Sequence, residues 1–155
     1  PLLQSEKAID INDQMPKFAF EFLKDQFPNL ANSNVLLLGV SYRGDIGDTR
    51  SSPVEKLYNY LINEDCTVYC HDPYVNYWNE KSIKISKELP ELMNNRLDLI
   101  IISTGHSIYR ENNTIDMIMK LKSIFLFDTL GYLSNNQIKK IQRKHLVKVL
   151  GRGDL

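Results

Sequence analysis

The feature that most constrains the fold is a set of short segments that are apolar almost throughout. Residues 34–39 read NVLLLG and residues 98–103 read DLIIIS, with no regular alternation of polar and apolar positions. A strand with one face in solvent alternates, whereas a strand covered on both faces is apolar on both. These segments therefore indicate a parallel sheet that is buried between layers of helices.

Helical patterns separate the apolar segments, so the chain alternates between strands and helices. We predict strands at 34–39, 67–71, 98–103, 124–128 and 146–150, a short additional strand at 82–85, and helices at 52–64, 87–95, 113–121 and 134–144. Such alternation builds right-handed crossovers. The expected fold class is α/β: a doubly wound, mainly parallel, six-stranded Rossmann-like sheet, with strand order 3-2-1-4-5-6 and the 82–85 strand at one edge.

An N-terminal helix is expected over residues 5–27, before a turn-rich linker. Apolar residues recur there at helical spacing: Ile11, Met15, Phe18 and Phe22. Pro16 predicts a kink or a restart of this helix, because proline cannot donate a backbone hydrogen bond. We therefore expect two regions, a helical region over 1–30 and a Rossmann-like domain over 31–155.

Composition narrows the classes of partner. The chain has 155 residues with 19 basic and 19 acidic side chains, a balance that favours neither nucleic acid nor an anionic membrane surface. No apolar run approaches the roughly 20 residues of a membrane span. No signal peptide pattern opens the sequence. We therefore expect no nucleic-acid partner, no membrane partner and a cytoplasmic location.

The two cysteines are expected to be core residues. Cys66 and Cys70 flank Val68 on one face of a predicted strand. His71, the nearest further ligand for a metal, points to the other face. A disulfide or a metal site is therefore not expected here.

Residues suited to ligand binding gather in the loops that follow the predicted strands. In a sheet of this kind, ligands bind beyond the carboxyl ends of the strands. The first such loop, VSYRGDIGDTR (40–50), carries Arg43 and Arg50 and precedes the helix start Ser51-Ser52-Pro53. Arginines beside a helix N-terminus favour a phosphate or diphosphate. The alternative is that these arginines pair with Asp45 and Asp48 and only stiffen the loop.

Familiar nucleotide signatures are absent. The spacing Gly39-x4-Gly44 begins like a phosphate-binding loop, but Asp45 follows where that motif needs lysine, and G-x-G-x-x-G does not occur after the first strand. Asp72 ends the second strand, where it could bind a ribose or start a turn. His106 could act as an acid or base, although a role in ordering its loop is favoured.

The segment GVSYRGDIGDTRSSP (39–53) resembles the UDP-binding domain of the UDP-glucose/UDP-N-acetylmannosamine (UDP-glucose/GDP-mannose) dehydrogenase family, whose motif runs G-x-x-[FY]-[KR]-x-x-x-x-D-x-R-x-S-P. Further pieces follow in the family's order: IDINDQMP, HDPYV, STGHSIYR, FDTLGY and LGRGDL. The resemblance covers nearly the whole chain. It implies an NAD-dependent enzyme that oxidises the C6 hydroxyl of a UDP-sugar to a carboxylate, with two NAD per turnover and a cysteine-bound intermediate.

The resemblance also assigns roles to individual residues. Tyr42 and Arg43 match the pair that contacts the substrate, and Arg50 matches the arginine that reaches the cofactor in another domain. Neither cysteine matches the family's nucleophile, and no lysine matches its catalytic lysine, so we expect a piece without the catalytic cysteine or the NAD domain, inactive alone. Leu130 replaces a substrate-binding arginine and Gly105 replaces the Asp of T-D-H.

Other expectations depend on the same resemblance. Residues 1–30 correspond to the end of the central helix through which the family dimerises, so the partners are the remaining domains, a second copy and the UDP-sugar. UDP-N-acetylmannosamine or a similar UDP-N-acetylhexosamine is the preferred substrate. The alternatives are UDP-glucose, a non-catalytic nucleotide-binding scaffold module, and an ordinary NAD-binding domain.

Overall fold

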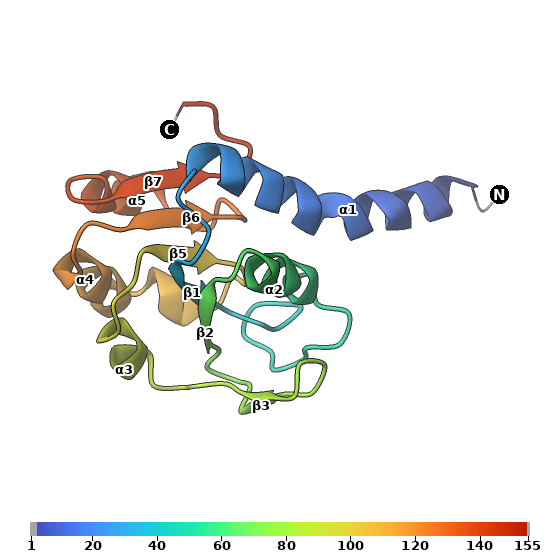
Figure 1. The fold of residues 1–155 in the computed structure, drawn as a ribbon, viewed down its shortest axis with the longest axis horizontal. Helices are drawn as coiled ribbons and strands as arrows, with labels where there is room; N and C mark the ends of the chain where they lie inside the picture. The colour runs from blue at the N-terminus through green and yellow to red at the C-terminus, as the bar shows by residue number, and fades with distance from the viewer. Residues whose placement is uncertain (1–2, 155) are drawn as a thin grey trace.

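The computed structural model describes residues 3–154, and the side chains from residue 14 onward. A five-stranded parallel sheet forms its centre, in the order β2-β1-β5-β6-β7 (Figure 1). The strands are β1 (Asn34–Leu38), β2 (Thr67–His71), β5 (Leu99–Ile102), β6 (Phe125–Asp128) and β7 (Leu146–Val149). The predicted parallel α/β sheet is thereby confirmed. The strand register aligns Leu38 with His71 and Ile102, so the carboxyl ends lie at one edge.

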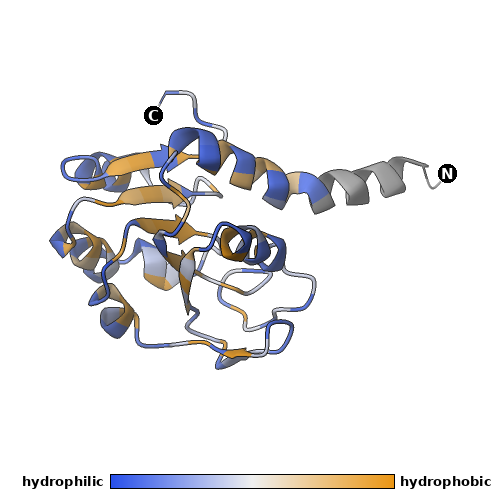
Figure 2. Cartoon of the chain, viewed as in Figure 1, coloured by the Kyte–Doolittle hydropathy of each residue, from blue (hydrophilic) through white to orange (hydrophobic). Residues whose placement is uncertain are grey.

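Helices cover both faces, as a doubly wound fold requires. The helices are α1 (Leu3–Gln26), α2 (Val54–Asn63), α3 (Leu89–Met93), α4 (Asn112–Lys120) and α5 (Asn135–Ile141), with a 3₁₀ turn η1 (Ser107–Arg110). Alternate strand residues pack on opposite sides: Leu37 and Ile101 face α1 and α2, whereas Leu36 and Ile100 face α3, α4 and α5. The inner strands β1, β5 and β6 are buried almost throughout, and β5 and β6 are largely orange in Figure 2. This two-sided burial explains why they show no alternation.

The short strand predicted at 82–85 is present, but its predicted place as a sixth strand at the edge of the parallel sheet is wrong. Residues Ile83–Lys84 form β4, which pairs antiparallel with β3 (Tyr77–Trp78) in a separate two-stranded sheet. The Trp78 side chain is fully buried and packs edge-on against Tyr58 of α2, which ties the hairpin to the core instead of to the sheet edge. A single parallel bridge between His71 and Ser86 is the only pairing of this segment with β2.

Helix α1 differs from the prediction in two respects. It runs without a break through Pro16. Its buried positions are Pro16, Ala19, Phe20 and Leu23, one residue away from the predicted stripe, while Met15 and Phe18 are about half exposed. The side chain of Ile11 lies outside the described residues.

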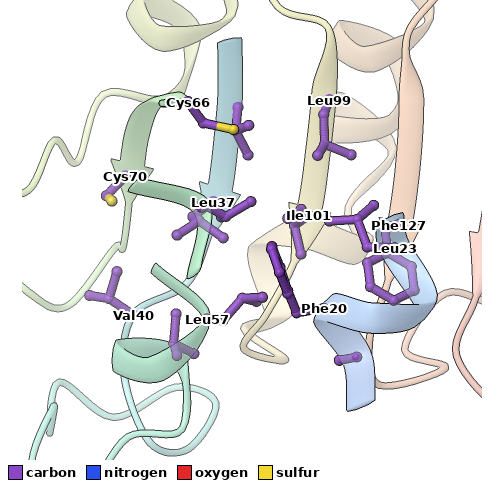
Figure 3. Packing of buried hydrophobic residues seen from close by; sticks show 14 of the residues in the cluster. Phe20, Leu23, Leu37, Val40, Leu57, Cys66, Cys70, Leu99, Ile101 and Phe127 are labelled. Carbon is purple, nitrogen blue, oxygen red and sulfur yellow. The ribbon is translucent and has the colours of Figure 1, made fainter. Parts of the chain in front are cut away.

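The physical reason for the shifted stripe is the packing of α1 on α2 and on the sheet. Ala19, Phe20 and Leu23 belong to the buried cluster that also contains Val54 and Leu57 of α2. Phe20 then stacks on Tyr60 of α2, with ring centroids 5.1 Å apart. Phe20 and Leu23 point toward the sheet beside Ile101 and Phe127 (Figure 3).

Candidate functional site

The candidate site is the edge where the parallel strands end. The loop after β1, residues 39–53, lies there beside the turn after β2 and the turn after β5. Thr104 Oγ1 donates to the carbonyl of Ser41 at 2.7 Å, and the Tyr42 N–H donates to the carbonyl of Asp48 at 2.7 Å. The loop that sequence reasoning selected is therefore folded back on itself and held by its neighbours.

Asp72 is the main acceptor that holds the start of this loop. One carboxylate oxygen, Oδ2, accepts from the backbone N–H groups of Val40 (3.0 Å) and Ser41 (3.1 Å) and from Ser41 Oγ (2.8 Å). His106 Nε2 lies 3.0 Å from the same oxygen. The other oxygen accepts from the Tyr74 N–H at 2.9 Å, in the turn that an Asp-Pro pair favours.

The surroundings of Asp72 keep it ionised. Burial by itself raises the pKa of Asp72, but hydrogen bonds from His106 and from the backbone N–H groups of Val40 and Tyr74 outweigh it and lower that pKa to about 2. Because both oxygens are engaged by the protein, neither is available to a ribose. The turn-forming interpretation of Asp72 is the one that this geometry supports.

His106 joins Asp72 to the middle of the loop. Its Nδ1 accepts the backbone N–H of Asp45 at 2.9 Å, so the ring proton lies on Nε2, which donates to Asp72. Asp45 in turn accepts from the N–H and the hydroxyl of Ser107, at 2.9 and 3.1 Å. His106 is fully buried, and the loop-ordering role that the sequence favoured agrees with these contacts.

The glycines of this loop serve close packing between segments of the protein. A Cβ on Gly44 would lie 2.1 Å from the carbonyl oxygen of Gly105, and one on Gly47 would lie 2.5 Å from that of Tyr74. Gly39 has a φ of +98° and faces Thr104. Protein atoms therefore occupy the space beside these glycines, so a phosphate cannot lie against their backbone as it does in a glycine-rich dinucleotide loop.

The two arginines of the loop have different surroundings. Arg50 forms a two-pronged pair with Asp48, at 2.9 Å from Nε and 2.7 Å from NH2, and its side chain is 83% exposed. The hydrogen bonds from Arg50 lower the pKa of Asp48 to about 2. Within the described residues, Arg43 makes no ion pair or hydrogen bond. Pairing thus stiffens the loop at Arg50 but leaves the Arg43 guanidinium available to a ligand.

The start of α2 offers less to an anion than the sequence indicated. Pro53 takes helical angles just before the helix begins at Val54. The N–H of Val54 donates to Ser52 Oγ at 3.4 Å, and the N–H of Glu55 donates to the carbonyl of Ser52 at 3.2 Å. These first N–H groups already have acceptors, so Arg43 is the stronger attraction for a phosphate at this edge.

The turn after β6 completes the edge. The buried Asp128 accepts from the N–H groups of Leu130 (3.0 Å) and Leu133 (2.9 Å), and this turn leaves the Leu130 side chain about half exposed. The ring of Tyr132 lies 3.0 Å from the position of a Cβ on Gly105. That contact gives a physical reason for glycine at 105, since a larger residue meets the ring.

An apolar pocket of about 220 Å³ opens beside this turn. Met15 and Ala19 of α1, Val54 and Leu57 of α2, and Leu130 are among its walls. Among the described residues its lining carries no charged side chain, so that lining does not attract a phosphate. The charged part of the candidate site is the adjacent 40–50 loop.

The cysteines are free and buried, as predicted. Burial raises the pKa of Cys70 to about 12, and burial likewise raises that of Cys66, whose thiol donates to the carbonyl of Leu30 at 3.2 Å. Neither thiol is suited to act as a nucleophile. Among the described residues, no cluster of His, Cys, Asp and Glu could hold a metal ion, and no helix is long and apolar enough to cross a membrane.

Sequence reasoning selected the right edge but missed several residues that build it. Tyr74 and Ser107 anchor the loop through contacts with Asp72 and Asp45. Ser107 directly follows the candidate His106 and Tyr74 lies two residues after Asp72, but no motif indicates the pairing of Ser107 with Asp45 across 62 residues. The roles of Tyr42, Arg43 and Arg50 in binding remain predictions.

Comparison with known proteins agrees with a candidate site at the carboxyl edge of the sheet. The sequence profile of the UDP-glucose/GDP-mannose dehydrogenase family, UDP binding domain, matches residues 36–135, which include the strands β1, β2, β5 and β6 and the loops at their ends. The match spans most of the edge described above. It therefore concerns the candidate site as well as the fold.

Individual proteins similar to this chain are also nucleotide-sugar dehydrogenases. The UDP-N-acetyl-D-mannosamine dehydrogenases of Methanococcus vannielii and Methanocaldococcus jannaschii are 29% and 32% identical to the chain, over 94% of its length in each case. The crystal structure of an NDP-N-acetyl-D-galactosaminuronic acid dehydrogenase from Methanosarcina mazei Go1 superimposes with a TM-score of 0.74 at 26% identity, over 92% of this chain and 30% of that one.

The chain spans about a third of the length of the curated relatives it matches, 34% and 33% for the two methanogen enzymes. The family profile matches the part of this chain that holds four of its five parallel strands, with β1 matched from residue 36, and the loop 39–53 at their carboxyl edge. The chain belongs to the UDP-glucose/GDP-mannose dehydrogenase family and contains its UDP binding domain.

Proposed function

We propose that the chain is the UDP-binding part of an NAD-dependent UDP-sugar 6-dehydrogenase, and that its substrate is UDP-N-acetylmannosamine or a similar UDP-N-acetylhexosamine. The observation that carries the proposal is the Arg43 guanidinium. It is exposed at the carboxyl edge and free of any partner among the described residues, in a loop that the protein holds in place. Arginine binds phosphate through charge-assisted hydrogen bonds, which are worth roughly 1.5–3 kcal/mol each.

The choice of sugar follows the relatives. Those matched over 94% of the chain are named UDP-N-acetyl-D-mannosamine dehydrogenases. In the proposal, Tyr42 lies beside Arg43 and contacts the same ligand; its side chain is 58% exposed. UDP-glucose is the competing substrate, and a comparison of the two sugars as ligands separates them.

The NAD cofactor belongs, in this proposal, to the remaining domains of the enzyme. The glycines of the 40–50 loop face protein atoms, so the chain itself holds no dinucleotide cradle in its described part. Arg50 is the residue proposed to contact NAD across the domain boundary, by exchanging its pair with Asp48 for the cofactor. The whole enzyme is proposed to be a cytoplasmic homodimer that dimerises through the region of residues 1–30, and this chain alone is proposed to be inactive.

The test is an NMR titration of the chain with UDP, UDP-N-acetylmannosamine, UDP-glucose and NAD, following the backbone amides of residues 40–50. We expect saturable shifts with the uridine ligands and little response to NAD. Replacing Arg43 with alanine should weaken UDP binding at least tenfold, because one charge-assisted contact is lost.

Arg96→Ala is the matched control. Arg96 is an exposed arginine close to the amino end of β5, at the opposite edge of the sheet, with its side chain 88% exposed. This variant should bind UDP as the wild type does. An equal loss of UDP affinity in both variants would mean that UDP binding depends only on the net charge of the chain. If the wild-type chain does not bind UDP at millimolar concentration, the proposed function is contradicted.

A further inference from the structure

The most unusual feature of this edge is a buried ionised carboxylate paired with a neutral histidine, neither of which reaches solvent. Asp72 and His106 are both fully buried, and Nε2 of the histidine lies 3.0 Å from Oδ2 of the aspartate. They come from different turns, after β2 and after β5 respectively. Burying a carboxylate is costly unless hydrogen bonds compensate, so the pair is expected to serve the structure around it.

The two members of the pair anchor opposite ends of one short segment. Asp72 accepts the N–H groups of Val40 and Ser41, and His106 accepts the N–H of Asp45. The residues between these anchors are 42–44, which include the exposed Tyr42 and Arg43. A segment fixed at both ends within so few residues has little freedom left, so the orientation of its side chains is largely determined.

Histidine is well suited to this bridge. Its two ring nitrogens let it accept at Nδ1 and donate at Nε2 along one rigid ring. Asparagine reproduces the position of Nδ1 and glutamine that of Nε2, but neither spans both. The bridge also holds Asp45, whose φ of +59° lies in the left-handed region, which aspartate tolerates only at some cost.

Close packing against neighbouring turns also restrains the same segment. Gly44 sits so near the carbonyl of Gly105 that no side chain fits between them, and the Tyr74 ring lies against the His106 ring with centroids 5.4 Å apart. The Asp45 carboxylate returns to the N–H of Ser107, the neighbour of His106. Gly105 and Ser107 flank His106 in the sequence, so these contacts surround the histidine.

We infer that the Asp72–His106 pair is a positioning device that holds residues 42–44 so that Tyr42 and Arg43 meet the uridine diphosphate. The inference rests on the proposed function for the identity of the ligand, but the holding of the loop does not. His106 acts through the loop and touches no ligand. A merely structural role lowers the stability of the whole fold, whereas a positioning role loosens residues 42–45 and weakens UDP binding beyond any loss of stability.

The test compares His106→Gln and His106→Asn with a matched control, His145→Gln. His145 is also buried and also accepts one backbone N–H, that of Ile124 at 3.2 Å, but it precedes β7 at the opposite edge. For the wild-type chain and for each variant of it we would measure thermal stability, backbone ¹⁵N heteronuclear NOEs, amide exchange at Asp45, and UDP affinity.

His106→Gln keeps the donor to Asp72 and loses the acceptor for Asp45. We expect faster exchange at Asp45, lower NOEs over residues 42–45, and about tenfold weaker UDP binding, the size of one lost hydrogen bond and its ordering effect. His106→Asn should retain more protection at Asp45 and lose order at residues 40–41 instead. His145→Gln should leave the order of the loop and the UDP affinity unchanged, even if it lowers the melting temperature as much as the His106 variants do.

The outcomes separate the two proposals. If the NOEs and the Asp45 exchange rate are unchanged in both His106 variants, the positioning inference is overturned, whatever the UDP affinity. If the wild-type chain does not bind UDP while the His106 variants lose order in the loop, the role of His106 in holding the loop is supported and the proposed function is contradicted. If both variants fail to fold, the ¹⁵N spectrum of the wild-type histidine ring decides, since a proton on Nδ1 contradicts the bridge.

Discussion

Replacing Asp72 with asparagine tests the physical basis of the site most quantitatively. The pKa of Asp72 falls from an ordinary 3.8 to about 2 in the folded chain. At 1.36 kcal/mol per unit this difference is worth about 2 kcal/mol of stability at neutral pH. The amide adds a second cost, because its NH₂ group must face an N–H donor on one side, and an unsatisfied buried donor costs about 1–3 kcal/mol.

The expected loss for Asp72→Asn is therefore about 3–5 kcal/mol, measured by urea unfolding at pH 7. For a domain of this size it lowers the melting temperature by roughly 6–20 °C. The control is Asp116→Asn, at an exposed carboxylate that pairs with Lys140 at 2.6 Å on the surface. An exposed pair contributes little, so this variant should stay within about 0.5 kcal/mol of the wild type.

The pH dependence gives an independent check. Because the folded pKa of Asp72 is depressed, its contribution is fully present above the unfolded value near 3.8 and is lost as the pH falls toward 2. The stability gap between wild type and Asp72→Asn should therefore shrink by about 1–2 kcal/mol between pH 5 and pH 2.5. A gap that stays constant over this window, or a variant as stable as Asp116→Asn, would refute the reasoning.

Three further predictions concern single positions. Gly44→Ala should destabilise the chain by at least about 2 kcal/mol in urea unfolding and displace the loop, because its Cβ would lie 2.1 Å from the carbonyl oxygen of Gly105; an unchanged midpoint contradicts that contact. Cys70, with a pKa of about 12, should react with a thiol reagent at neutral pH only after urea is added, and rapid labelling of the native chain argues against its burial. Leu130→Arg should tighten UDP binding about fivefold in a calorimetric titration, because it adds a cation at the carboxyl edge; weaker binding would place the ligand away from this turn.

The sheet could be predicted from sequence because it depends on a one-dimensional pattern. Segments such as VLLL (35–38) and LIII (99–102) are buried on both faces, and both appear in the structure as parallel strands. The predicted place of the 82–85 strand at the sheet edge was wrong because it depends on a contact between residues distant in the sequence. Nothing local indicates that Trp78 packs against Tyr58 of α2, yet this contact holds the β3–β4 hairpin away from the sheet.

The N-terminal helix shows the limit of periodicity. Large apolar residues at positions 15, 18 and 22 predict one stripe, whereas Ala19, Phe20 and Leu23 are the residues that pack in the cluster shared with α2 and the sheet. Which face of a helix is buried is decided by its partner, and the partner is far away in the sequence. Met15 and Phe18 remain about half exposed in consequence.

The candidate site was predicted at the level of the edge and the loop, but not at the level of its contacts. The carboxyl ends of parallel strands meet at one edge, which is a property of topology. The bridge from Asp45 through His106 to Asp72 joins residues 27 to 61 positions apart across three loops. Such a network depends on side-chain geometry that no local motif encodes.

The most direct test of the account is a crystal structure of this chain with UDP bound. We expect the diphosphate within hydrogen-bonding distance of the Arg43 guanidinium, with the backbone of residues 40–50 unchanged and the Asp72–His106 contact intact. A nucleotide bound instead at the opposite edge, beside Asp98 and Phe125 near the amino ends of the strands, would contradict the central claim that the 40–50 loop binds the uridine diphosphate.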